Sequence, residues 1–257
     1  MPPPRLLPPS LRFEALDALR GLAVVWMTIY HFCFDLNHFG YLQQNFLADP
    51  FWTLQRTAIV SLFLFCAGMG QAAAQMQTRG PAPFWRRWAQ IAGCALLVSA
   101  ASWVMFPASF IYFGVLHAIA AMLLIVQALG RWGQRHALGL AVLATALLLL
   151  PLAAPALLAP SGLQELFDSR ALNWLGWISR KPFTEDYVPL LPWAGVMVWG
   201  LLVGQLVLRN PPGWLEAPVP GAGRPLVWLG RRSLGWYMLH QPVLIGLLAS
   251  AGWLTRP

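Results

Sequence analysis

Charged side chains are scarce in this chain of 257 residues. Asp, Glu, Lys and Arg make up 10% of it, while 58% of the residues are hydrophobic. An ordinary soluble domain carries about 25% charged residues, so the shortage excludes that class. The net charge of +8 does not indicate nucleic acid either, because the basic residues are dispersed between apolar segments and form no basic face. The composition predicts a polytopic protein of the lipid bilayer.

Cysteine is rare, and we expect no cleavable signal peptide. The three cysteines, Cys33, Cys66 and Cys94, lie in apolar segments at spacings that fit no zinc or redox motif. The first residues, MPPPRLLPPSLRFEA, are rich in proline, and no apolar core of a signal peptide precedes the long segment that starts at Leu16. We expect residues 1–11 to form a disordered cytoplasmic tail and residues 12–257 to form a single transmembrane domain.

Seven apolar stretches are long enough to cross a bilayer: 15–37, 52–76, 86–106, 110–129, 137–158, 188–208 and 225–252. An odd number of spans places the two termini on opposite sides. With the N-terminus inside, 12 of the 17 basic residues fall on the cytoplasmic side, as the positive-inside rule requires. The sequence therefore predicts an all-α bundle of about seven transmembrane helices with N-in/C-out topology.

The longest outer connection runs from Pro160 to Asp186. Within it, the stretch ALNWLGWISRK is too short to span a bilayer, and its two tryptophans are typical of the membrane interface. We predict a short interfacial or re-entrant helix there. No internal repeat is visible, which weighs against the inverted repeats of many transporters.

The first predicted span carries ionisable side chains in one stripe. Its members recur every three or four residues, and they are Asp17, Arg20, Val24, Thr28, His31 and Asp35. Charges near the bilayer centre cost about 2.5–3.5 kcal/mol each on insertion scales, so they usually face a bundle interior or a wet cavity. Asp17 is spaced to pair with Arg20, and Asp35 is spaced to orient His31. The stripe predicts a functional interior face, and mutual neutralisation during insertion is the alternative.

Two further histidines, His117 and His240, are predicted at a similar depth to His31, in the outer half of the bilayer. Three histidines are able to bind zinc, but nothing in the sequence brings these three together, and we expect no metal. Each of them also fits a hydrogen-bonded packing residue. His38 is expected at the outer mouth, where a solvated role is the default.

An ordered series of motifs resembles a known family. They are RFEALDALRGLAVVWMTIYHFCFDL, LFLFCAGMG, FGVLH, DYVPLLPWAGV and LGRRSLGWYMLHQPVL, and together they cover residues 12 to about 245. The series resembles the bacterial branch of the heparan-alpha-glucosaminide N-acetyltransferase catalytic-domain family, within the transmembrane acyltransferases. The resemblance implies a multi-pass protein of the bacterial inner membrane. It also implies transfer of an acetyl group from cytosolic acetyl-CoA to an amine or hydroxyl of a glycan or amino-sugar acceptor on the periplasmic side.

The resemblance also implies residue roles. Polysaccharide O-acyltransferases of the wider group share an arginine followed, after ten residues, by a histidine, and Arg20 and His31 match this pair. Arg20 would then be a coenzyme-side residue and His31 the catalytic one. The lysosomal members look different, with an asparagine where His31 falls and their catalytic histidine where this chain has His38. Both histidines stay candidates, and we favour His31 because it shares the stripe with Asp35.

The phosphates of CoA need cations at the cytoplasmic face. Four arginines are predicted there, Arg12, Arg20, Arg231 and Arg232, with Asp17 beside them, although plain positive-inside anchoring would place them equally well. At the outer face, Asp186 and Tyr187 are the predicted contacts of the acceptor.

Two rival functions remain. A proton-coupled transporter of a small solute would also bury Asp and His side chains, and in a non-enzymatic scaffold the stripe would only pack. The sequence leaves open the acceptor, N- versus O-acetylation, acetyl versus another acyl group, direct transfer versus an acetyl-histidine, and whether the protein forms a homodimer.

Overall fold

The computed structural model describes residues 12–77 and 80–255, and the predicted tail, residues 1–11, lies outside the described residues. Within the described residues the fold is largely helical, and an isolated β-bridge joins Phe113 and Tyr187. The chain forms two compact units, each described here by itself. Unit 1 contains residues 64–210, and unit 2 contains residues 12–63 together with the chain from 211 onward. The single domain over residues 12–257 stays a prediction.

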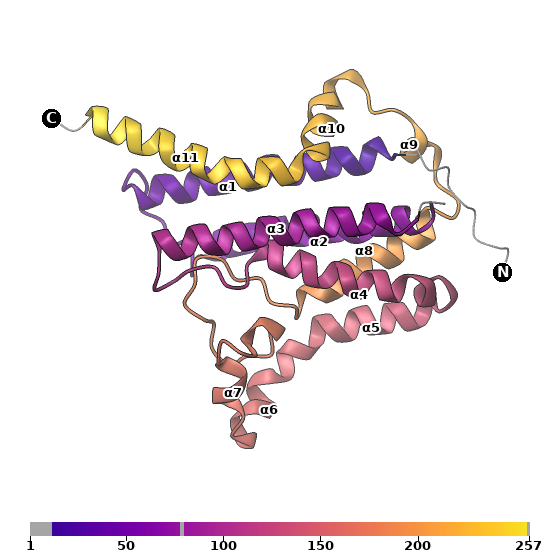
Figure 1. Ribbon diagram of the computed structural model, residues 1–257, viewed down its shortest axis with the longest axis horizontal. Helices are drawn as coiled ribbons and strands as arrows, with labels where there is room; N and C mark the ends of the chain where they lie inside the picture. The colour runs from indigo at the N-terminus through magenta and orange to yellow at the C-terminus, as the bar shows by residue number, and fades with distance from the viewer. Residues whose placement is uncertain (1–11, 78–79, 256–257) are drawn as a thin grey trace. The chain divides into compact units, whose positions relative to one another are not determined.

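Unit 2 is built around its first helix. Its elements are α1 (Glu14–His38), the first half of α2 (Pro50–Gln75), α9 (Gly213–Glu216), the 3-10 turn η3 (Gly221–Gly223), α10 (Arg224–Arg231) and α11 (Ser233–Thr255). The helix α1 ends where Gly40 adopts a positive φ of 84°, a conformation that favours glycine. Figure 1 shows α11, in yellow, lying beside the second half of α1, in indigo. Both α10 and α11 therefore pack on one helix.

Two glycines allow α10 to approach the backbone of α1 directly. A Cβ atom at Gly21 would overlap the backbone carbonyl of Leu226, and a Cβ atom at Gly230 would overlap that of Asp17. Small residues at helix contacts are the usual way for membrane helices to pack closely, because lipid offers no hydrophobic driving force between them. This contact sets the position of α10 against the start of α1.

An aromatic cluster holds the loop after α1 in place. Phe46 stacks on Trp52 with ring centroids 4.0 Å apart, and Tyr30 meets the two rings edge-on at 5.7 and 5.9 Å. Met27 and Ile59 are buried in the same cluster. Together these contacts fix the part of α1 that carries His31.

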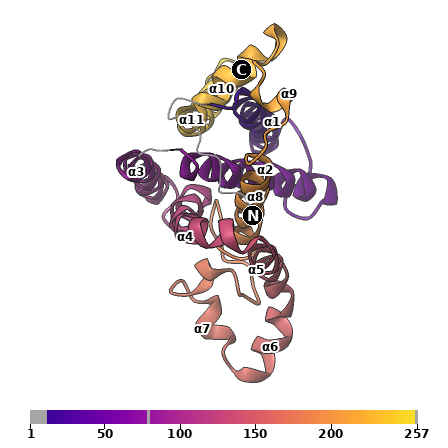
Figure 2. The same ribbon diagram turned by 90° about the vertical axis from the view of Figure 1, so that its right-hand side faces the viewer.

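Unit 1 contains the rest of α2 and the central part of the chain. Its elements are α3 (Ala82–Met105), α4 (Val115–Arg135), α5 (Ala137–Leu149), η1 (Leu150–Ala153), α6 (Ala154–Ser161), α7 (Gln164–Asp168), η2 (Asn173–Leu175) and α8 (Trp193–Val207). Seen along the helices, α3 lies against α4 and α5 against α8 (Figure 2). A Cβ atom at Gly200 would overlap the backbone of Phe65, and one at Gly204 would crowd Ala72. Gly200 and Gly204, which have the spacing GxxxG, thus lie at a close helix contact.

Three backbone carbonyls, one turn apart on α4, receive side-chain donors from other parts of unit 1. Gln75 Nε2 donates to the carbonyl of Val126 at 3.0 Å, and Gln205 Nε2 donates to that of Gly130 at 2.9 Å. The third donor is Arg209 Nη2, which lies 2.6 Å from the carbonyl oxygen of Gln134. Hydrogen bonds of this kind tie helices together inside a bilayer.

The membrane prediction is confirmed. In the described residues, α1, α2, α3, α4 and the continuous segment Ala137–Ser161 are long and apolar enough to span a bilayer, and α8 is a shorter apolar helix. The count of seven spans and the N-in/C-out topology stay predictions. The predicted single span at 225–252 is wrong, because the chain turns at Arg232 and divides it into α10 and α11. At this turn Gly230 contacts the backbone of Asp17, and Arg231 is drawn to acids of α1.

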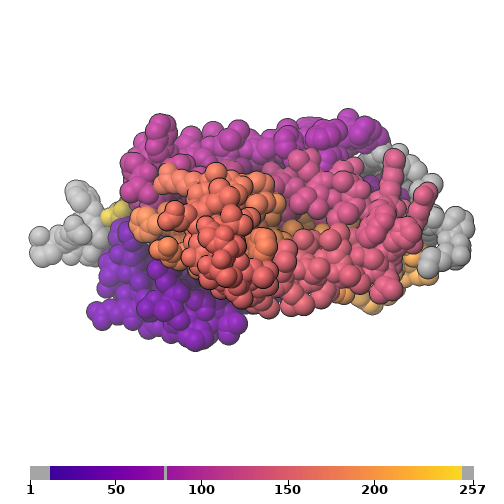
Figure 3. Space-filling model, turned by 90° about the horizontal axis from the view of Figure 1, so that it is seen from below, coloured from indigo at the N-terminus to yellow at the C-terminus, as the bar shows by residue number. Residues whose placement is uncertain are grey.

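The predicted helix in the outer connection is also wrong for the stretch ALNWLGWISRK, which contains only the turn η2. Side-chain hydrogen bonds hold this connection instead of a helix. Asp168 accepts the backbone N–H and the hydroxyl of Ser179 at 2.8 and 2.5 Å, and Gly176 turns the chain with a φ of 87°. Burial opposes ionisation of Asp168, but the hydrogen bonds from Ser179 and Arg180 outweigh it and lower the pKa of this carboxyl. The connection, in orange, covers one surface of unit 1 (Figure 3).

Candidate functional site

An ion-pair cluster lies at the start of α1 in unit 2. Arg20 Nη1 is 3.2 Å from Asp17 Oδ1, so the pair predicted from the sequence spacing is present. Arg231, at the end of α10, binds the other oxygen of Asp17 through Nε at 3.2 Å and Glu14 Oε1 through Nη2 at 3.0 Å. One carboxylate is thus shared by two guanidinium groups, which holds both in fixed positions.

The cluster leaves its cations within reach of a ligand. The side chain of Arg231 is 36% exposed, and Arg12, just before α1, is also exposed. The guanidinium of Arg232 lies 4.5 Å from the ring centroid of Trp228, a cation–π contact that orients it without neutralising its charge. All four predicted arginines belong to unit 2, where α10 packs against α1: Arg12, Arg20, Arg231 and Arg232.

Further along α1, its polar stripe faces α11. Trp236 Nε1 donates to Thr28 Oγ1 at 2.9 Å, the rings of His31 and His240 lie 5.0 Å apart, and Gln241 Nε2 donates to Asp35 Oδ1 at 2.8 Å. We call these six residues the polar seam. Residue numbers rise together along the two helices in these contacts, so α1 and α11 run parallel. The polar face predicted on α1 thus packs against α11.

Three buried atoms of the polar seam have no hydrogen-bond partner among the described residues. They are Asp35 Oδ2, His240 Nε2 and Gln241 Oε1. Asp35 is 3% exposed and His240 is 7% exposed, so both side chains are shielded from solvent. Buried polar atoms are nearly always satisfied in native proteins, and an exception calls for an explanation such as a ligand or a catalytic role. These unpartnered atoms make the polar seam the candidate binding site of unit 2.

The tautomer of His240 follows from its neighbour. Its Nδ1 atom lies 2.7 Å from the backbone carbonyl oxygen of Tyr237, which can only accept. Nδ1 must therefore carry the hydrogen, and in a neutral ring Nε2 then carries a lone pair. With Asp35 ionised, all three unpartnered atoms of the seam are acceptors, and a hydrogen-bond donor would satisfy them.

The structure changes one expected pairing. Asp35 was predicted to orient His31, but its bonded partner is Gln241 of α11, and the described ring contacts of His31 are with Tyr30 and His240. Gln241 was not singled out from the sequence. The sequence does contain an indication of its role, because a glutamine next to a histidine inside an apolar span is costly without a polar partner.

His117 lies in unit 1, and both of its ring nitrogens are engaged. Its Nδ1 accepts the backbone N–H of Gly114 at 3.3 Å, and its Nε2 is 3.0 Å from the hydroxyl of Ser99, which itself donates to the carbonyl of Ile111. His117 therefore ties the start of α4 to α3. Its convergence with His31 and His240 stays a prediction.

Asp186 and Tyr187 also have defined partners within unit 1. Asp186 Oδ2 accepts the backbone N–H of Val115, the first residue of α4, at 2.8 Å, where a negative charge also favours the helix dipole. The Tyr187 hydroxyl donates to the carbonyl of Asn173 at 2.6 Å, and burial raises the pKa of this phenol. Both residues hold the outer connection in place through these hydrogen bonds. Their role as acceptor contacts stays a prediction.

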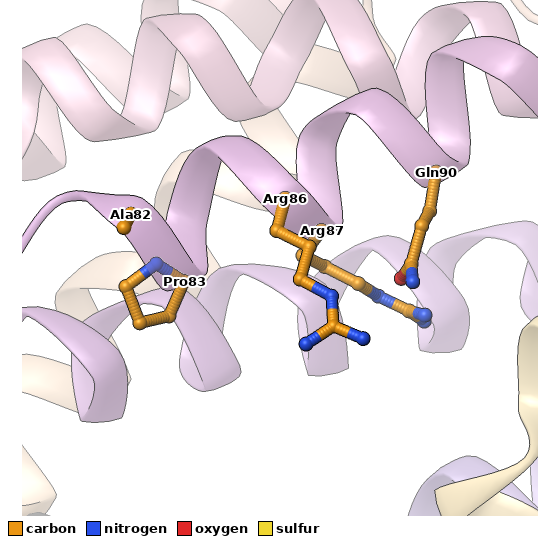
Figure 4. Close-up of a pocket in the computed structure, with 5 residues that line it drawn as sticks. All are labelled: Ala82, Pro83, Arg86, Arg87 and Gln90. Atoms are coloured by element: carbon orange, nitrogen blue, oxygen red, sulfur yellow. The ribbon is translucent and has the colours of Figure 1, made fainter.

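The other candidates are more peripheral. His38 is exposed at the last turn of α1, where its ring contacts that of Phe39. No group of three His, Cys, Asp or Glu side chains suited to a metal occurs in the part of the chain that the structure describes. Figure 4 shows an open hollow along the first turns of α3, where Arg86, Arg87 and Gln90 extend from the same helix. It has lining residues from one helix only, so it encloses no ligand.

These features define a class: a helical membrane protein with bilayer-length apolar helices, in which one helix carries both a cluster of ion-paired side chains and a buried polar site. A scan against protein families matches residues 12–242 with the family described as heparan-alpha-glucosaminide N-acetyltransferase, catalytic. The chain belongs to this family, which implies acetyltransferase activity in general and acetyl-CoA as the usual donor. Comparisons with curated proteins and with solved structures gave no match.

Proposed function

We propose that this protein transfers an acetyl group from cytosolic acetyl-CoA to an amine or hydroxyl of a glycan-type acceptor on the other side of the membrane. One observation carries the proposal: α1 presents the ion-pair cluster and the polar seam on the same stripe. Arg20 and His31 are eleven residues apart, which corresponds to about 16 Å along a helix axis. The pantetheine arm of acetyl-CoA has to bridge this distance for its thioester to reach His31.

The donor end of the site is the ion-pair cluster. A guanidinium has five N–H donors, and the two ion pairs of Arg231 leave others for a phosphate. Asp17 and Glu14 position the arginines, so less side-chain entropy is lost when the coenzyme binds. The positive-inside rule favours the cytoplasm for this end of α1.

The acceptor end of the site is the polar seam. An amine or a hydroxyl supplies the donors that Asp35 Oδ2, His240 Nε2 and Gln241 Oε1 lack. The parallel course of α1 and α11 is in keeping with termini on opposite sides of the membrane. A side chain of the seam then either takes a proton from the acceptor for direct attack, or His31 carries the acetyl group as a covalent intermediate.

The burial of Asp35 also favours a second candidate, a proton-coupled transporter, in which a carboxyl of this kind would bind and release a proton. This alternative predicts solute flux driven by a pH gradient and no consumption of acetyl-CoA. Family membership supports the transferase instead.

Binding of acetyl-CoA to the detergent-purified protein tests the donor site. We expect calorimetry to detect binding to the wild type, and the dissociation constant to rise about 10-fold or more in Arg20→Ala, since a hydrogen bond to a charged group contributes about 1.5–3 kcal/mol. His31→Ala should bind nearly as well as the wild type.

Arg131→Ala, in unit 1, is the matched control because it removes an exposed arginine that is not in the cluster. It should leave binding unchanged. Absence of binding to the wild type well above micromolar concentrations would remove the main support for the transferase, and flux assays would then decide for the transporter.

A further inference from the structure

We propose that His240 is the general base of this site, and that Gln241 and Trp236 position it. The inference rests on the proposed acetyl transfer and assigns its proton-transfer step to a side chain of α11. Three observations carry it: the fixed tautomer of His240, the lone pair that this leaves at a buried atom, and the two hydrogen bonds that set its register.

The tautomer gives His240 the electronic state that a base needs. The carbonyl of Tyr237 holds the hydrogen on Nδ1 at 2.7 Å, so Nε2 is the atom that can take a proton. A carbonyl on the far nitrogen also stabilises the imidazolium that forms, because the N–H that it accepts becomes a stronger donor. This is the arrangement by which acid–base histidines are oriented for proton transfer.

A buried ring nitrogen without a partner distinguishes His240 from His38, His117 and His136. Both ring nitrogens of His117 have partners, and His38 and His136 are exposed. His240 is 7% exposed, and its Nε2 atom has no partner among the described residues. A buried acceptor atom without a hydrogen-bond partner costs stability unless a ligand donates to it. Its ring neighbour His31, 5.0 Å away, is the residue that the stripe on α1 brings to the same place.

Hydrogen bonds on either side of His240 fix its position on α1. Trp236 binds Thr28, one turn before His240, and Gln241 binds Asp35 immediately after it. Directional bonds of this kind set the register of two helices in a bilayer, where apolar side chains slide past each other at little cost. Gln241 acts through this register, so it is a positioning residue and not a catalytic one.

The proposed step balances as follows. The acceptor oxygen or nitrogen attacks the carbonyl carbon of the acetyl thioester, and His240 Nε2 takes the proton that the acceptor loses. The new O–C or N–C bond forms as the C–S bond breaks. The CoA thiolate leaves and receives the same proton from His240, so the products are the acetylated acceptor and CoA with a free thiol.

The test compares His240→Ala and His240→Asn with the wild type in detergent. CoA release from acetyl-CoA is measured with glucosamine as the acceptor probe, together with acetyl-CoA affinity and thermal unfolding. Asparagine keeps a polar group of similar size, which guards against loss of the fold. We expect a loss of CoA release of about 10²–10⁴-fold with near-unchanged affinity, the range that general acid–base catalysis contributes.

Two further readouts separate catalysis from packing. Added imidazole should restore CoA release to His240→Ala and should do nothing for Gln241→Leu, which disturbs the register. His136→Ala is the control for removal of an exposed histidine. If either folded His240 variant keeps more than a tenth of the wild-type rate, the inference is wrong while the transferase stands. If the wild type itself releases no CoA, the proposed function fails and the inference fails with it.

Discussion

Gly230→Ala is expected to destabilise the protein strongly, although alanine is the better helix former. The new Cβ atom would overlap the backbone carbonyl of Asp17, which cannot rotate away as a side chain does. Overpacking usually costs about 1–3 kcal/mol, and a backbone obstacle places this variant at the upper end or beyond. The measurement is the midpoint of thermal unfolding in detergent, with size-exclusion chromatography to detect aggregation.

Gly235→Ala is the matched control on the neighbouring helix. Nothing lies within 4 Å of a Cβ atom built at Gly235, so only helix propensity changes there, by about 0.5–1 kcal/mol in favour of alanine. The two substitutions should therefore shift the midpoint in opposite directions. A Gly230→Ala protein that melts at or above the wild-type temperature would contradict the direct contact of α10 with α1.

His31→Ala is expected to lower CoA release by about 100-fold or more, because its ring lies 5.0 Å from that of His240, at the proposed site of transfer. Its thermal stability should stay close to that of the wild type, because the described contacts of the ring are aromatic ones with Tyr30 and His240. The assay is CoA release from acetyl-CoA with glucosamine present, run beside the binding measurement.

His38→Ala provides the comparison that the family resemblance calls for. His38 is exposed at the end of α1, and we expect its variant to keep most of the activity. The reverse result, a silent His31→Ala and an inactive His38→Ala, would move the reaction to the end of α1 and away from the polar seam.

Local patterns in the sequence were sufficient for α1. Its stripe depends only on the helical repeat, so the Asp17–Arg20 pair and the interior face at His31 and Asp35 could be predicted without any other helix. Most spans were likewise recognisable because bilayer thickness fixes the length of an apolar helix.

The partner of that face was not predictable in the same way. The bond between Gln241 and Asp35 joins residues more than 200 positions apart, and it depends on the register of α11 along α1. The helix α11 also starts only after the turn at Arg232, whereas the hydropathy of residues 225–252 predicts one continuous span. The three side-chain donors to α4 were hidden for a related reason, since their acceptors are backbone carbonyls that no residue type reveals.

Acetylation across a sealed membrane tests the central claim most directly. Purified protein is reconstituted into vesicles with glucosamine trapped inside, and labelled acetyl-CoA, which does not cross the bilayer, is added outside. Molecules inserted with the cluster outward should produce labelled sugar inside the vesicles, and His31→Ala vesicles should not. Label that appears only when both substrates share one side, or no labelled sugar at all, would contradict transfer through the membrane.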